Sequence, residues 1–213
     1  MPDSRALRAQ FDDLGQQREA AALGMWVLLA TEVLFFGALF TGYTVYRLAF
    51  HDAFVAGSGH LNVVLGTANT AVLITSSLTM ALADVASRSG SRRAVIGFLA
   101  ATAVLGSAFL AIKGLEYAQE YREGLVPLNS LVFSYSGPDA ERVQMFFNFY
   151  FAMTGWHSLH LLIGIGLLIV FIVLAWRGRD RVRLEGNVRA GALYWHFVDI
   201  VWLFLFPVLY LVR

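Results

Sequence analysis

Two histidines stand three residues apart where the sequence offers almost no other polar side chain. His157 and His160 lie in MTGWHSLHLLIGIG, inside a stretch from 143 to 176 that contains no Asp, Glu, Lys or Arg. On a helix this spacing places both imidazoles on one face, about one turn apart. Imidazoles at such a site can bind a metal or a haem, hold a proton, or join helices by hydrogen bonds.

Other ionisable side chains lie in further apolar stretches. Glu32 lies in LLATEVLFF, His196 and Asp199 lie in YWHFVDIVW, and Lys113 and Glu116 lie in AIKGLEYAQE. Each such group costs a few kcal/mol to place inside a membrane, so each is a candidate for function or for helix packing. We predict a buried polar network of Glu32, His157, His160, His196 and Asp199, with Lys113 and Glu116 as polar residues at a helix end.

Five long apolar segments must position these side chains. The chain of 213 residues is 58% hydrophobic and only 15% charged, and its mean hydropathy is +0.62. About 20 apolar residues cross the hydrocarbon core of a bilayer, and a chain in lipid must satisfy its backbone hydrogen bonds internally. The sequence therefore predicts an all-α integral membrane protein, a bundle of five transmembrane helices at about 22–47, 62–87, 94–119, 145–176 and 190–212.

Arginines are distributed unevenly between the two sides of this predicted bundle. The first 20 residues and the second and fourth loops together carry eleven of the sixteen basic residues. Short loops rich in arginine stay in the cytoplasm. We therefore predict a cytoplasmic tail over 1–20, a transmembrane domain over 21–213 and an external C-terminus. Four arginines of the fourth loop are expected to face lipid headgroups: Arg177, Arg179, Arg181 and Arg183.

The composition excludes some kinds of site in this chain. The chain has no cysteine, which excludes disulfides, thiolate ligands and cysteine nucleophiles. Its basic residues form no single patch, so nothing points to nucleic-acid binding. Metal binding, haem binding between two histidines, proton handling by Glu32 and interhelical hydrogen bonding all remain open, and the spacing favours the last. We expect Tyr194, Trp195 and Trp202 to be anchors at the membrane interface.

Motifs in all five segments resemble subunit III of the haem–copper oxidases. TGWHSLHLLIGI resembles the family motif TGFHGLHVIIG, and YWHFVDIVWLFLFPVLYL resembles the family's C-terminal helix. LLATEVLFFGALF, NTAVLITSSLTMALA and KGLEYAQE match three further helices. Trp156 and Ser158 replace the usual Phe and Gly. The chain matches only the last five helices of the seven-helix members.

The resemblance implies an accessory subunit III of a proton-pumping cytochrome c oxidase, a respiratory complex that reduces oxygen to water. It implies no catalytic residue, haem or metal in this chain, with haem and copper held by partner subunits I and II. The chain is expected to pack against subunit I in a bacterial cytoplasmic membrane, support proton uptake and bind phospholipids. Subunit II, small subunits and cytochrome c are further expected partners of the complex.

Three alternatives are a quinol oxidase subunit III, a nitric oxide reductase accessory protein and a stand-alone proton-linked transporter. The absence of an internal repeat counts against the transporter. In every case we predict that Glu32 lies within hydrogen-bonding reach of His157 or His160.

Overall fold

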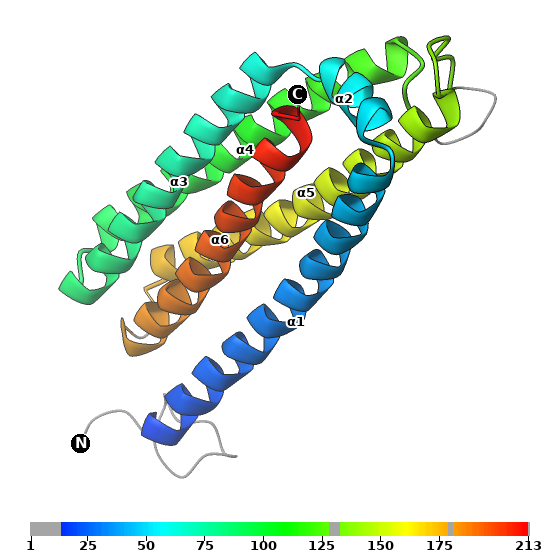
Figure 1. The fold of residues 1–213 in the computed structure, drawn as a ribbon. Coiled ribbons are helices and arrows are strands. Elements are labelled where there is room, and N and C mark those ends of the chain that lie inside the picture. Colours follow the sequence, from blue (N-terminus) through cyan, green and yellow to red (C-terminus); the bar gives the residue numbers. More distant parts are fainter. Residues whose placement is uncertain (1–13, 128–132, 179–180, 213) are drawn as a thin grey trace, which may run out of the picture.

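The structure, a computed structural model, describes residues 14–127, 133–178 and 181–212. Five helices are long and apolar enough to cross a membrane, and each overlaps one predicted segment. The predicted all-α fold class is confirmed, since the described residues contain no strand. The helices are α1 (Leu14–Ala49), α2 (His51–Gly59), α3 (Val63–Ser89), α4 (Arg92–Arg122), α5 (Ala140–Trp176) and α6 (Arg181–Tyr210) (Figure 1).

The short helix α2 is a feature that the sequence did not predict. Its nine residues, HDAFVAGSG, are too few to show a periodic pattern. Phe54 is fully buried, and α2 packs against α5. Gly57 permits this approach, because a Cβ atom there would lie 2.5 Å from the ring of Phe146. The connection between the first two spans is therefore a packed part of the bundle.

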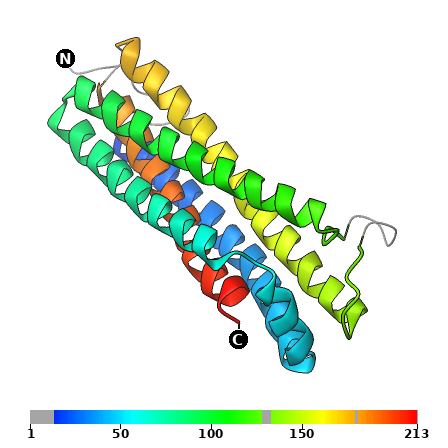
Figure 2. The same ribbon diagram turned by 90° about the horizontal axis from the view of Figure 1, so that it is seen from above.

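Local signals set the ends of α3. The side chain of Asn62 caps its start, where Oδ1 accepts hydrogen bonds from the backbone N–H groups of Val64 and Leu65 at 3.0 and 3.1 Å. Gly90 ends the helix in the left-handed conformation, with a φ of 77°, which glycine adopts at little cost. The tight turn brings α4 back beside α3, and the two helices run side by side (Figures 1 and 2).

Helix α6 is the innermost span. Half of its most apolar window is buried inside the bundle, compared with 11% for α1. Trp195 and Trp202 are at most 1% exposed and Tyr194 is 5% exposed, so the prediction of interfacial anchors is wrong. Glycines make room for one of these rings: Cβ atoms at Gly106 of α4 and Gly164 of α5 would lie 2.7 and 3.0 Å from Trp195.

Hydroxyl groups tie α1 and α2 to the C-terminal end of α6. Tyr43 Oη donates to the carbonyl oxygen of Val208 at 2.8 Å, and Ser58 Oγ donates to that of Leu209 at 2.8 Å. The last carbonyls of a helix lack partners within the helix, so these bonds satisfy groups that would otherwise be unpaired. The start of α1 and the end of α6 lie at opposite ends of the bundle (Figure 1).

Candidate functional site

The predicted contact between Glu32 and one of the paired histidines is present, and it joins α1 to α5. His160 Nε2 lies 2.9 Å from Glu32 Oε2. On the other side of the ring, His160 Nδ1 lies 2.8 Å from the carbonyl oxygen of Trp156. Because a carbonyl only accepts, Nδ1 must carry a hydrogen. The contact with Glu32 then requires one further proton, held by either Nε2 or the carboxyl group.

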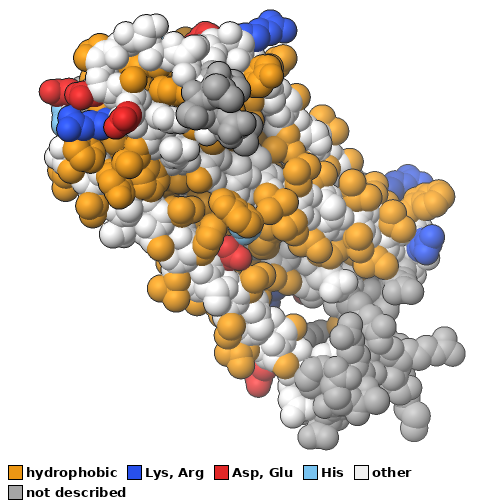
Figure 3. All heavy atoms as spheres, turned by 90° about the vertical axis from the view of Figure 1, so that its right-hand side faces the viewer, with side chains coloured by type: hydrophobic (Ala, Val, Ile, Leu, Met, Phe, Trp, Pro, Cys, Tyr) orange, Lys and Arg blue, Asp and Glu red, His pale blue; other side chains and the backbone are white. Residues whose placement is uncertain are grey.

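This Glu32–His160 pair lies near the outside of the bundle. The side chains of His160 and Glu32 are 11% and 21% exposed, and the ring centroid of Phe36 lies 5.4 Å from that of His160. Figure 3 shows acidic and histidine atoms in the middle of a largely hydrophobic face. The pair is therefore a polar site that holds one shared proton inside apolar surroundings.

His157 does not join this contact. Its ring is fully buried, with centroids 5.5 Å from Phe109 and 5.2 Å from Trp202. Neither ring nitrogen has a hydrogen-bond partner among the described residues. The prediction that both histidines belong to one network is wrong for His157. A spacing of three residues turns the two side chains about 60° apart around the helix axis, so His160 faces α1 while His157 faces α4 and α6.

His196 and Asp199 lie at the interface between α6 and α3, away from Glu32. His196 Nδ1 lies 2.8 Å from Ser77 Oγ. Asp199 is 6% exposed, and no hydrogen bond of normal geometry reaches either carboxyl oxygen from the described residues. The prediction of one polar layer shared with Glu32 is wrong, because this face of α6 meets α3 rather than α1.

Lys113 and Glu116, predicted as polar residues at a helix end, are instead enclosed by the bundle. Each side chain is 2% exposed, and Lys113 Nζ lies 2.9 Å from Glu116 Oε2. The ammonium also donates to the hydroxyls of Tyr150 at 2.8 Å and Tyr210 at 2.5 Å. Tyr210 in turn donates to Glu116 Oε1 at 2.7 Å. We call these four residues the Lys113 cluster; all three N–H groups of its ammonium are used.

Aromatic rings complete the surroundings of the ammonium. Lys113 Nζ lies 4.5 Å from the ring centroid of Tyr150, 5.1 Å from that of Tyr210 and 5.4 Å from those of Tyr117 and Trp202. Ring faces attract cations, most strongly where water is excluded. The Lys113 cluster therefore joins α4, α5 and α6. The spacing of Lys113 and Glu116 suggests an ion pair, but no local pattern marks the two tyrosines that complete it.

Removing the Glu32–His160 hydrogen bond should weaken the packing of α1. We expect Glu32→Leu to cost about 0.6–2 kcal/mol, the range for polar contacts between helices in membranes. The measurement is the free energy of unfolding in mixed detergent micelles. A double-mutant cycle with His160→Leu should give a coupling energy of the same size. Additive effects of the two substitutions would contradict an energetic role for this contact.

The four arginines predicted to face lipid, and a possible metal site, are the last points of the sequence analysis to compare with the structure. Arg177 is exposed just after the end of α5. Arg179 lies outside the described residues, as do the side chains of Arg181 and Arg183, which begin α6. Within 14–127, 133–178 and 181–212, no group of three or more His, Cys, Asp or Glu side chains is placed to hold a metal ion.

Comparison with known proteins gives similarities along nearly the whole chain. The family model for cytochrome c oxidase subunit III matches residues 15–212. Cytochrome c oxidase subunit 3 of Thermostichus vulcanus is 30% identical, over 98% of this chain and 96% of that protein. Cytochrome bo(3) ubiquinol oxidase subunit 3 of Pseudomonas aeruginosa is 29% identical, over 88% of this chain and 83% of that protein.

A third relative differs in length. The heme-copper oxidase subunit I+III of Aeropyrum pernix is 30% identical over 88% of this chain, which corresponds to 22% of that longer protein. The family match covers all five spans and both polar sites described above. The chain therefore belongs to the subunit III family of the haem–copper oxidases.

Proposed function

We propose that this chain is the accessory subunit III of a proton-pumping cytochrome c oxidase and that it performs no redox step itself. The observation that carries the proposal is the similarity to the Thermostichus vulcanus subunit over 96% of that protein's length. A match of this extent leaves little of the relative without a counterpart here. The redox centres, haem and copper, would then belong to partner subunits I and II.

Subunit I is the proposed direct partner. The relative from Aeropyrum pernix, named as a subunit I+III, supports this assignment because a matching segment there shares one chain with a subunit I. The outer face of α1 also carries large apolar side chains at high exposure, among them Leu34 at 73% and Leu48 at 78%. Such a face suits burial in lipid or against other transmembrane helices.

The two polar sites fit a supporting role in such a complex. The Lys113 cluster ties three helices together at one end of the bundle, and the Glu32–His160 pair ties α1 to α5 further along. We propose that these contacts keep the bundle rigid while the complex turns over. A role of Glu32 in proton uptake is part of the proposal, supported by the single proton that the pair must share.

Orientation and lipid contact follow from the distribution of arginines. We propose that the N-terminus is cytoplasmic and the C-terminus external, in a bacterial cytoplasmic membrane. The arginine-rich sequence 177–183 would then face the cytoplasmic leaflet, where anionic phospholipid headgroups attract basic side chains. The exposed position of Arg177 supports this assignment.

Affinity purification tests the proposed function directly. A tagged copy of this chain, extracted from its native membrane in mild detergent, should bring down a larger subunit that carries haem and copper. The purified complex should oxidise reduced cytochrome c and consume oxygen. The same chain produced alone should show no haem absorbance. Recovery of the chain without any haem-containing partner would contradict the proposal.

A quinol oxidase is the second candidate, favoured by the similarity to the ubiquinol oxidase subunit of Pseudomonas aeruginosa. The same purified complex distinguishes the two. Oxidation of a quinol without oxidation of reduced cytochrome c would assign the chain to a quinol oxidase, and the reverse result would support the first proposal.

A further inference from the structure

Glu120 is a buried carboxyl group that the contacts described so far leave unexplained. It lies on α4 about one turn beyond Glu116, near the end of the helix, and is only 3% exposed. No hydrogen bond of normal geometry reaches either of its carboxyl oxygens from the described residues, although the Tyr150 hydroxyl lies nearby. Glu116 differs in this respect, because it receives hydrogen bonds from Lys113 and Tyr210.

The groups that interact with Glu120 offer it no free positive charge within the part of the chain that the structure describes. Lys113 is the one cation among them, and its three N–H groups already go to Glu116, Tyr150 and Tyr210. The titratable side chains that interact with Glu120 are Lys113, Glu116 and Tyr117 on α4, Glu123 directly after its end, Tyr150 on α5 and Tyr210 on α6.

The balance of charges among these enclosed groups indicates the protonation state of Glu120. With Glu120 ionised, the enclosed groups would comprise one ammonium and two carboxylates, with one negative charge unbalanced. An unpaired carboxylate away from water costs several kcal/mol, whereas the neutral acid costs much less. We propose that Glu120 is a proton-binding site, a neutral carboxylic acid that completes the electrical balance of the Lys113 cluster. The proton is taken up from a hydronium ion of the solvent, which becomes water, and the new O–H bond forms on a carboxyl oxygen of Glu120.

A chain of hydrogen-bonding groups connects this acid to the end of the bundle. The hydroxyl of Tyr150 lies beside Glu120 and accepts one hydrogen bond from Lys113. A second lone pair on that oxygen is available to accept the O–H of the acid. Beyond Lys113 the chain continues through Tyr210 to Glu116. These contacts place Glu120 beside the polar interior of the Lys113 cluster.

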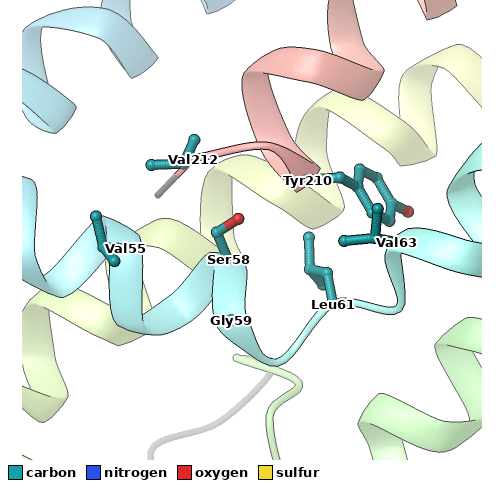
Figure 4. Close-up of a pocket in the computed structure, with 7 residues that line it drawn as sticks. All are labelled: Val55, Ser58, Gly59, Leu61, Val63, Tyr210 and Val212. Carbon is teal, nitrogen blue, oxygen red and sulfur yellow. The ribbon is translucent and has the colours of Figure 1, made fainter.

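A hollow at the end of the bundle adjoins this chain. Tyr210 borders a pocket of about 320 Å³ between α2, the turn into α3 and the residues after α6 (Figure 4). The hydroxyl of Ser58 is a polar group in its wall, and the volume exceeds that needed for a water molecule. Tyr210 thus both lines this pocket and belongs to the Lys113 cluster. Its remaining lining residues are Val55, Gly59, Leu61, Val63 and Val212.

Infrared spectroscopy of the intact purified complex tests the assignment. The wild-type protein should show a carboxylic acid C=O band that shifts between H₂O and D₂O, and Glu120→Gln should remove it. Glu120→Asp should move the band rather than abolish it. Glu141→Gln is the matched control, because Glu141 is an exposed glutamate in the first turn of α5 and is not among the groups that interact with Glu120; this variant should leave the band unchanged.

Two results would overturn the proposal. Identical carboxylic acid bands in the wild-type protein and Glu120→Gln would show that Glu120 is ionised. A thermal midpoint that rises with Na⁺ or K⁺ in the wild-type protein but not in Glu120→Gln would assign the site to a metal cation instead of a proton. Neither measurement requires oxygen reduction or a particular electron donor, so failure of this inference is distinct from failure of the proposed function.

Discussion

Replacing Lys113 by Met should destabilise the protein by about 3–5 kcal/mol, the cost of leaving one member of a buried ion pair unpaired. Glu116 would keep the hydrogen bond from Tyr210 but lose Lys113, the only cation among the described residues within bonding distance of it. The hydroxyls of Tyr150 and Tyr210 would lose a donor as well. The measurement is the free energy of unfolding in detergent micelles, with the thermal midpoint of the complex as a second readout.

Two further variants separate charge from packing in this result. The double variant Lys113→Met with Glu116→Gln should recover a large part of the lost stability, because no charge remains unpaired. Asp139→Asn removes the partner of Arg142 in an ion pair whose side chains are about half exposed, and it should cost no more than about 1 kcal/mol. Equal losses in Lys113→Met and Asp139→Asn would contradict a special role for the buried pair.

Replacing Trp195 by Ala should also cost about 3–5 kcal/mol, through the cavity left by a buried indole. The ring fills the space between α4 and α5 at Gly106 and Gly164, and its Nε1 donates to Ser76 Oγ of α3 at 3.1 Å. One side chain of α6 therefore contacts three other helices. The free energy of unfolding in micelles again provides the measurement.

Trp176→Ala is the matched control for this prediction. Trp176 ends α5 and is 78% exposed within the chain, so its removal creates no internal cavity. We expect its effect to be well below that of Trp195→Ala.

A larger side chain at Gly106 tests the same packing. Gly106→Val should cost about 1–3 kcal/mol, because the added side chain pushes against the indole of Trp195. Gly97→Val, which has open space around it, should be nearly neutral. Comparable losses at the two glycines would contradict the proposed packing.

The positions of the two polar sites suggest how an accessory subunit maintains its shape in lipid. Apolar contacts between transmembrane helices gain little over contacts with lipid, so close packing and polar bonds must hold the bundle together. The Lys113 cluster joins α4, α5 and α6 at one end, and the Glu32–His160 pair joins α1 to α5. Because α1 is the least buried span, its position depends strongly on the few polar contacts that it makes.

The sequence alone determined the five spans, since the length and apolarity of a segment decide whether it can cross a bilayer. It also predicted the contact between Glu32 and the histidine pair, which the structure places at His160. Asn62 and Gly90, which end α3 by local hydrogen bonding and by backbone conformation, act through neighbours in the sequence. These features depend on composition, spacing or short-range geometry.

Only the tertiary structure decided which neighbour each side chain meets. Helical periodicity shows that His157 and His160 share a side of α5, but not that one faces aromatic rings and the other a carboxylate. Hydrophobicity does not separate a helix-facing position from a lipid-facing one, because lipid is as apolar as the protein interior. For this reason Trp195 resembled an interfacial anchor and Lys113 a helix-end residue, although packing against distant segments encloses both.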